Sequence, residues 1–309
     1  MRQAYDFLRE LINGLRILRG SARDLVLPSV GSPEYAHLAR RIGYVAQDGL
    51  SAGQRLHVDF ETFTATVRAF MHRHFGASQV GSGGAGSAAD LIIETDPEPA
   101  LVEPVLSSTN FADHPQALLI LRRLMGDRSA REPLARLAVL AFDTLALLAD
   151  PDMALTNWER FAAAVPDRAH HFARMLAQPL ALDILLRLFS TSQFLADTLV
   201  RDPDFLDWIA DSRRLHSKRS RQEMVGDLEQ LIEAEGHLDW QDVMRRFRRR
   251  ELLRIATRDL CLGVSLARGD RRALYPGRRC HPGQLSARRG TNRRRATGVR
   301  RRPGQARGW

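Results

Sequence analysis

The segment between residues 185 and 206 constrains the fold most strongly, because it combines apolar side chains at helical spacing with signals that begin helices. Side chains that recur every three or four residues share one face of an α-helix. Ser192 and the pair Asp202-Pro203 are residue types that start helices. The segment therefore predicts short, packed, amphipathic helices. Its apolar positions are Leu185, Leu186, Leu188, Phe189, Phe194, Leu195, Leu199, Phe205 and Leu206.

The same helical pattern extends over most of the 309 residues. A wide apolar face is predicted from Tyr5 to Leu18, and one long helix is predicted from Trp240 to Leu266. Convincing β-type alternations are few, and a hydrophobic content of 44% suits a globular core. The sequence therefore predicts an all-α fold.

The chain divides into four predicted segments. A helical domain occupies residues 1–76, and a linker occupies 77–112, of which 77–90 is rich in Gly, Ser and Ala. A second helical segment follows at 113–266, and an Arg-rich tail at 267–309 is expected to be disordered because it has few large apolar side chains. The expected architecture is thus two helical bundles joined by a Gly/Ser-rich linker.

Helix starts can be placed from capping residues. Ser32 followed by Pro33 predicts a helix that begins at Pro33. A further helix is expected from about Asp59 to Phe75. Asp113-His114-Pro115 predicts another start, and the capping-box pattern over 156–159, Thr-Asn-Trp-Glu, predicts one more.

The formal net charge of +10 is unevenly distributed. Residues 268–309 contain 14 Arg and one Asp, a net charge of +13, so residues 1–267 carry −3. The basic character therefore belongs to the tail rather than to the helical part. A nucleic-acid role for this tail is an alternative that predicts strongly salt-dependent binding. The tail lacks interleaved aromatic residues, so we do not favour it.

Three blocks of residues resemble the bifunctional glutamine synthetase adenylyltransferase/adenylyl-removing enzymes. Residues 4–44, with Ala4-Tyr5-x-Phe7-Leu8-Arg9 at their start, are similar to the helical domain that follows a nucleotidyltransferase domain in that family. PII-uridylyltransferases carry a related domain. Residues 185–206 and 247–260 are similar to helices that precede such a domain. The resemblance covers roughly residues 4–266, and its order indicates the central fragment of the enzyme, between two catalytic domains.

The resemblance implies an activity for the whole enzyme. It would transfer AMP from ATP to a tyrosine of glutamine synthetase and remove it by phosphorolysis, under the control of PII protein and glutamine. Mg²⁺ and ATP are the implied cofactors, while glutamine synthetase and PII protein are the implied partners. The sequence shows neither a signal peptide nor a run of apolar residues long enough to span a membrane, so we expect a cytoplasmic protein.

The catalytic signature of this family is not found in the sequence. That signature is a Gly-rich turn followed by Ser-Asp-x-Asp-Leu, in which two aspartates hold Mg²⁺. The nearest pattern is Gly86-Ser87 followed by Asp90-Leu91, where Ile92 stands in place of the second aspartate. We therefore assign no catalytic, cofactor-binding or metal-binding residue and expect the chain alone to be inactive. The tail from Arg268 is expected to be a frameshifted sequence, with a split gene as the alternative.

Other motifs have simpler interpretations. Residues 81–86 satisfy G-x-G-x-x-G, but a predicted helix precedes them, so we interpret them as linker. His72-x-His74 and the pair His170-His171 lack the further ligands that a metal site needs. Four aromatic residues of the predicted third helix are core candidates: Phe60, Phe63, Phe70 and Phe75.

A basic run on the last predicted helix leaves two interpretations open. It comprises Arg245, Arg246, Arg248, Arg249 and Arg250. We favour a solvated, ion-paired helix face over an interdomain or phosphate contact. For the chain as a whole, the alternative to an enzyme fragment is a non-catalytic helical interaction protein.

Overall fold

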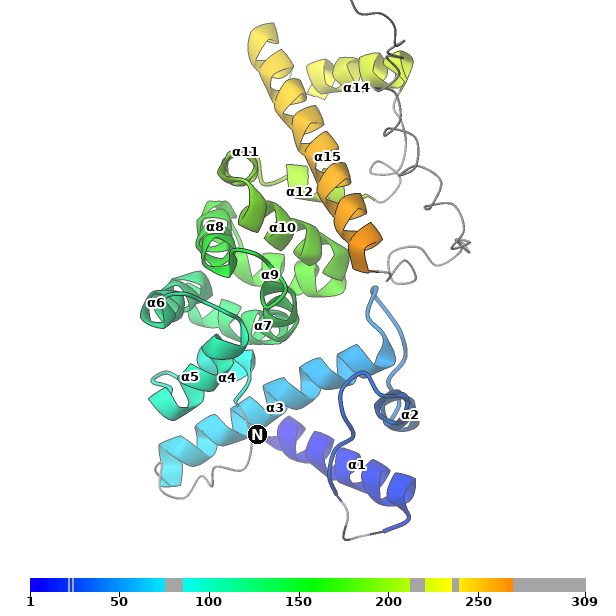
Figure 1. The fold of residues 1–309 in the computed structure, drawn as a ribbon, viewed down its shortest axis with the longest axis vertical. Coiled ribbons are helices and arrows are strands. Elements are labelled where there is room, and N and C mark those ends of the chain that lie inside the picture. Colours follow the sequence, from blue (N-terminus) through cyan, green and yellow to red (C-terminus); the bar gives the residue numbers. More distant parts are fainter. Residues whose placement is uncertain (22, 24, 76–85, 212–219, 235–238, 269–309) are drawn as a thin grey trace, which may run out of the picture. The chain divides into compact units, whose positions relative to one another are not determined.

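The computed structural model describes residues 1–21, 23, 25–75, 86–211, 220–234 and 239–268. All regular elements in these ranges are helical, and the residues lie mostly in α-helices (Figure 1). The elements are α1 (Arg2–Arg19), α2 (Pro33–Arg41), α3 (Ala52–Phe75), α4 (Ala88–Ile93), α5 (Pro99–Ser108), α6 (His114–Met125), η2 (Arg128–Ala130), α7 (Arg131–Leu145), α8 (Pro151–Ala164), α9 (Arg168–Ala177), α10 (Pro179–Thr191), α11 (Gln193–Arg201), α12 (Phe205–Ala210), α14 (Arg221–Ala234) and α15 (Trp240–Arg268).

Helices α1, α2 and the start of α3 share a small hydrophobic core. Ser32 caps α2, since its Oγ accepts a hydrogen bond from the Tyr35 amide at 3.1 Å, as its position before Pro33 predicted. Close packing also depends on Gly14, where an added Cβ would lie 2.6 Å from the side chain of Ile42. The buried members of this cluster are Leu11, Leu15, Tyr35, Leu38, Ala39, Ala52 and Leu56.

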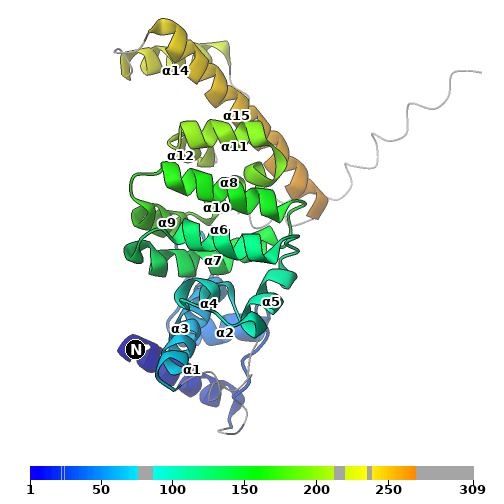
Figure 2. The ribbon, with the colours of Figure 1, turned by 90° about the vertical axis from the view of Figure 1, so that its left-hand side faces the viewer.

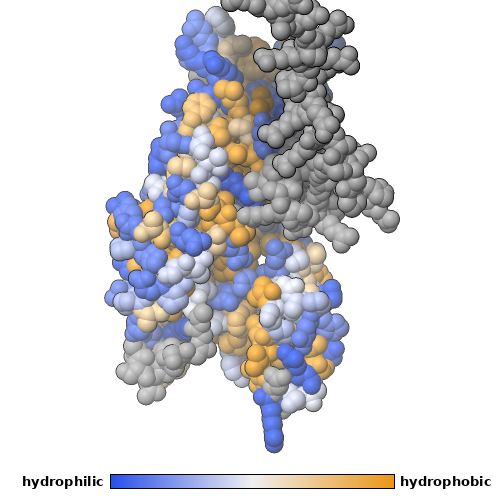
Figure 3. Space-filling model, viewed as in Figure 1, coloured by the Kyte–Doolittle hydropathy of each residue, from blue (hydrophilic) through white to orange (hydrophobic). Residues whose placement is uncertain are grey.

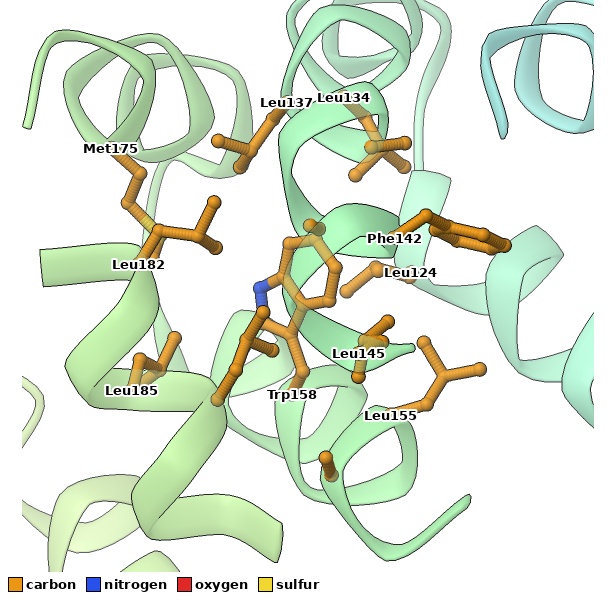
Figure 4. Close-up of a cluster of buried hydrophobic side chains, with 14 of the residues drawn as sticks. Leu124, Leu134, Leu137, Phe142, Leu145, Leu155, Trp158, Met175, Leu182 and Leu185 are labelled. Carbon is orange, nitrogen blue, oxygen red and sulfur yellow. The ribbon is translucent and has the colours of Figure 1, made fainter. Parts of the chain in front are cut away.

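A larger core lies among helices α4 to α12. Helix α7 packs against α4, α9 and α10, and α8 packs against α6, α10 and α11 (Figure 2). Trp158 of α8 is fully buried at its centre. Figure 4 shows the indole among side chains of neighbouring helices, including Leu137, Leu145 and Leu182. The apolar positions predicted from residues 185–206 all belong to this core except Phe194, which is 58% exposed.

The prediction of two separate bundles is wrong in one respect, because α3 belongs to both. Leu56 lies in the first cluster, while Val58 and Ala65 lie in the second. Helix α3 packs against α1 and α2 and also against α4 and α7. It begins at Ala52, seven residues before the predicted start, so it is long enough to serve both cores. Phe75, a predicted core residue, is 59% exposed at the end of this helix.

The predicted linker over 77–112 is too long. Residues 88–93 and 99–108 form α4 and α5, whose side chains are part of the larger core. Leu91 and Ile92 are almost completely buried there. Burial of these apolar residues outweighs the weak local signal of a short, Pro-containing segment. Residues 76–85, which include most of the Gly-rich stretch, lie outside the described residues.

Two predicted helix starts need correction. Residues 156–159 lie inside α8, which begins at Pro151 after an Asp150 cap whose Oδ1 accepts from the Met153 amide at 2.8 Å. The hydroxyl of Thr156 donates to the Asp152 carbonyl, as it does within a continuous helix. Helix α12 begins at Phe205, not directly after Asp202-Pro203.

The last helix agrees with its prediction. Helix α15 starts at Trp240 and continues to Arg268, two residues beyond the predicted end. Residues 269–309, which make up nearly all of the predicted disordered tail, lie outside the described residues. Among the helices that are described, none combines the length and apolar character needed to cross a bilayer.

Hydrophobic side chains also reach the surface. Figure 3 shows apolar residues interspersed with polar ones, including over the region of α1 and α2. On α1, Tyr5 and Ile17 are 63% and 60% exposed, and on α15 Trp240 is 67% exposed. Single exposed apolar residues of this kind are common on protein surfaces.

Candidate functional site

The basic run of α15 contacts an acidic turn that joins α11 to α12. Arg246 Nη1 lies 2.8 Å from Asp202 Oδ1, and its Nη2 lies 2.6 Å from Asp204 Oδ2. Arg249 Nη2 reaches the second oxygen of Asp202 at 3.2 Å. Two arginines one helical turn apart therefore hold the same carboxylate, and we call this group the arginine clamp (Asp202, Asp204, Arg246 and Arg249).

The chain sequence explains why Asp202 stands where it can accept both arginines. It directly follows Arg201, the last residue of α11, and its amide donates to the Thr198 carbonyl. Its own carbonyl accepts from the Phe205 amide, which fixes the turn into α12. The Asp202 side chain is 6% exposed, whereas that of Asp204 is 66% exposed. A buried carboxylate needs charged or hydrogen-bonding partners, so Asp202 is the anchor of the clamp.

Aromatic rings of α12 extend the contact between α15 and the α11–α12 turn. The guanidinium of Arg246 lies 5.1 Å from the ring centre of Phe205, and that of Arg250 lies 4.5 Å from Trp208, both on α12. Arg250 also approaches Asp227 of α14 at 3.6 Å. Cation–π contacts of this kind add to the ion pairs and favour arginine over lysine. The run thus joins α15 to both α12 and α14.

A buried ion pair lies one turn further along α15. Arg254 Nε donates to Glu251 Oε2 at 2.9 Å, and the two side chains are 6% and 8% exposed. Nearby, the Thr257 hydroxyl donates to the Leu253 carbonyl, and Leu253 itself is part of the larger core. Helix α15 is therefore fixed by charged side chains as well as by apolar packing.

Four of the five arginines of the basic run are ion-paired, but the prediction of a solvated face is wrong for the three that contact other elements. Arg245 pairs with Asp242 of its own helix at 2.7 Å, whereas Arg246, Arg249 and Arg250 pair with other elements. Arg248 is exposed. The run is therefore mainly an interhelical contact rather than a fully solvated face. The phosphate contact considered beside it stays untested.

The nearest pattern to a nucleotidyl-transfer signature has a structural role. The Ser87 amide donates to Asp90 Oδ2 at 2.7 Å, which forms a capping box at the start of α4. The same Asp90 oxygen pairs with Arg68 Nη2 of α3 at 2.9 Å. Burial raises the pKa of Asp90, while the positive charge of Arg68 opposes that rise. Asp90 therefore connects α3 to α4.

The two histidine motifs, His72-x-His74 and His170-His171, do not form a metal-binding group in the described part of the chain. His72 lies 3.5 Å from Glu94 and 3.6 Å from Glu98, while the ring of His74 contacts that of Phe70 at a tilted angle. His170 is exposed, but His171 is buried. Within the described part of the chain, no three His, Cys, Asp or Glu side chains are arranged to hold a metal ion.

The arginine clamp lies within the part of the chain that matches a known family. A profile described as glutamate-ammonia ligase adenylyltransferase matches residues 182–268, which include both the acidic turn and α15. Residues 182–268 are therefore similar to this family. No solved structure matches it significantly.

Curated relatives match more of the chain and carry one name, bifunctional glutamine synthetase adenylyltransferase/adenylyl-removing enzyme. The protein of Thioalkalivibrio sulfidiphilus is 24% identical over 285 residues, covering 84% of this chain and 28% of that protein. The protein of Xanthobacter autotrophicus is 26% identical, with 90% and 27% covered. That of Corynebacterium diphtheriae is 23% identical, with 88% and 26% covered. The chain thus spans little more than a quarter of the length of these relatives.

Proposed function

We propose that this chain provides the helical region that separates two nucleotidyltransferase domains in an enzyme that adenylylates and deadenylylates glutamine synthetase. Residues 1–76 would follow the first catalytic domain, and residues 113–266 would precede the second. The resemblance of the three sequence blocks supports this order. The names of the curated relatives support the activity of the whole enzyme.

The observation that carries this proposal is the arginine clamp. It joins α15 to the α11–α12 turn inside the region matched by the family profile. A helix that leads toward a catalytic domain must hold a defined direction if that domain is to meet its substrate in the correct orientation. We infer that the clamp sets the direction of α15. The role of the chain is therefore to position catalytic domains rather than to perform chemistry.

Substrate, cofactors and location follow from the proposed role. Glutamine synthetase would be the protein substrate, and PII protein would be a regulatory partner, in the cytoplasm. ATP and Mg²⁺ would bind to the catalytic domains that flank this region. Asp90 is engaged by Arg68 and the Ser87 amide, so it is not presented to a nucleotide. We therefore expect no AMP transfer by the chain alone.

Transfer of labelled AMP from ATP to glutamine synthetase tests the proposal. The purified chain with Mg²⁺ should incorporate no label above a blank. A Thioalkalivibrio enzyme in which the matching region is replaced by residues 1–266 of this chain should incorporate label. In that chimera Asp202→Ala should reduce the rate, whereas the exposed Asp204→Ala serves as the matched control with a smaller effect.

Two results would contradict the proposal. The first is AMP transfer by the chain alone. The second is a chimera that shows the thermal transition of the parent enzyme but no transfer. The second result would favour a free-standing helical interaction protein, which has no need to orient catalytic domains.

A further inference from the structure

A cavity of about 420 Å³ lies between α3 and α7, far in sequence from the clamp. The first turn of α1 and the end of α4 also contribute to its lining. Along α3 its lining extends from Thr62 to Arg73, roughly 16 Å at the rise of an α-helix. The volume lies within the range of sites that hold small molecules.

The polar part of the lining is dominated by four arginines: Arg73, Arg128, Arg131 and Arg136. Arg136 is neutralised, since its Nη2 lies 2.6 Å from Asp59 Oδ1. For the other three, no carboxylate of the described residues lies within ion-pairing distance. Arg131 donates only to the weakly accepting Met125 sulfur, at 3.3 Å. With Glu132 as the acidic residue of the lining, the cavity keeps a net positive charge.

Apart from Gln3 and the amino group of Met1, much of the remaining lining is apolar. Phe63 and Phe70 of α3 and Ile93 of α4 form part of the wall. The hydroxyls of Thr62 and Thr66 already donate to backbone carbonyls of α3, at 2.7 and 2.8 Å. A ligand that fits such a lining has an anionic end, which arginines recognise, and an apolar body, which the aromatic wall covers.

We propose that this cavity binds a small organic phosphate with an apolar body. Phosphate fits better than a carboxylate because it carries up to two negative charges and three acceptor oxygens, which can engage more than one guanidinium at once. Arginine supplies paired donors in a planar fork that matches phosphate oxygens. This site lies outside residues 182–268 and is independent of the proposed positioning role.

Phenyl phosphate is the probe, because it combines a phosphate with one apolar ring. Isothermal titration of the full chain at physiological ionic strength should give saturable binding, and inorganic phosphate should bind more weakly because it leaves the apolar wall uncovered. Arg73→Gln/Arg128→Gln, at two exposed positions, should weaken phenyl phosphate binding by about tenfold or more. Arg131→Gln alone is a second variant that should weaken it less.

The matched control is Arg122→Gln on α6. Arg122 is exposed, pairs with Asp96 at 3.6 Å and does not line the cavity, so binding should be unchanged. The arginines of residues 268–309 are present in every variant, and their contribution cancels in the comparison. Binding that does not saturate, or that is equal in the wild type and the double variant, would overturn the proposal. Equal affinity for phenyl phosphate and inorganic phosphate would overturn the proposal that the apolar wall contacts the body of the ligand.

Discussion

Replacement of His171 by phenylalanine should remove much of the acid sensitivity of this protein. His171 lies on α9, with its ring centre 5.3 Å from that of Phe161 and 5.9 Å from that of Phe172. Its Nε2 is buried and has no hydrogen-bond partner among the described residues. Burial, together with the nearby positive charges of Arg174 and His170, lowers its pKa from 6.5 to about 4.

The sign and size of the effect follow from proton linkage. Above pH 6.5 the imidazole is neutral in both the folded and the unfolded chain, so it contributes no pH dependence. As the pH falls from 6.5 toward 4, the unfolded chain takes up a proton that the folded chain does not, and stability is lost. The two pKa values differ by about 2.5, and each pKa unit corresponds to about 1.36 kcal/mol. The loss should therefore approach 3 kcal/mol, as an order of magnitude.

Urea unfolding followed by circular dichroism at a series of pH values between 7 and 4 measures this effect. The difference in unfolding free energy between His171→Phe and the wild type should shift in favour of the variant as the pH falls. Buried carboxylates such as Asp90 respond to pH in both proteins, so their contribution cancels. His170→Gln, at the exposed neighbouring position, should keep most of the wild-type dependence. A parallel response of His171→Phe and wild type would refute the reasoning.

Three other changes test the packing and the caps. Trp158→Ala should lower the unfolding free energy by about 3–5 kcal/mol in urea titration, because a fully buried indole is lost. A smaller loss would mean that neighbouring side chains fill the space that the indole leaves. Asp202→Ala should lower the free energy of unfolding by about 2 kcal/mol and speed hydrogen exchange in α15. At the exposed position, Asp204→Ala should lower the free energy of unfolding by less than about 1 kcal/mol. Asp150→Ala removes the cap of α8 and should lower the free energy of unfolding by about 1 kcal/mol, which appears as a lower melting temperature. An unchanged melting temperature would contradict the assigned helix start.

The sequence predicted the helical class and many helix boundaries, because these depend on local periodicity and capping. Ser32 and Asp113 cap helices as predicted, through hydrogen bonds to amides three residues later. The capping-box pattern at 156–159 failed because Asp150-Pro151 is a stronger start six residues earlier, and the helix simply continues through Thr156. Local patterns compete, and the sequence alone does not say which one prevails.

The clamp could be predicted only in part. The sequence alone shows the basic run on α15 and the helix-start pair Asp202-Pro203. Their contact joins residues 44 apart in sequence, from Asp202 to Arg246, and depends on how α12 turns after α11. Likewise, the arginines around the α3–α7 cavity come from separate elements and share no motif. Pairings of this kind are set by tertiary packing rather than by spacing along the chain.

The membership of α3 in both hydrophobic clusters has an energetic consequence. Leu56 and Val58 are two residues apart on one rigid helix, yet they are buried in different cores. Unravelling of α3 would remove packing from both cores at once, so neither can melt while the other keeps its full stability. A substitution that weakens the packing of Leu15 should therefore also destabilise the packing around Ala65 and in the helices that follow. Residues 1–75 and the helices that follow are thermodynamically coupled through a single element, and they should unfold in one cooperative transition.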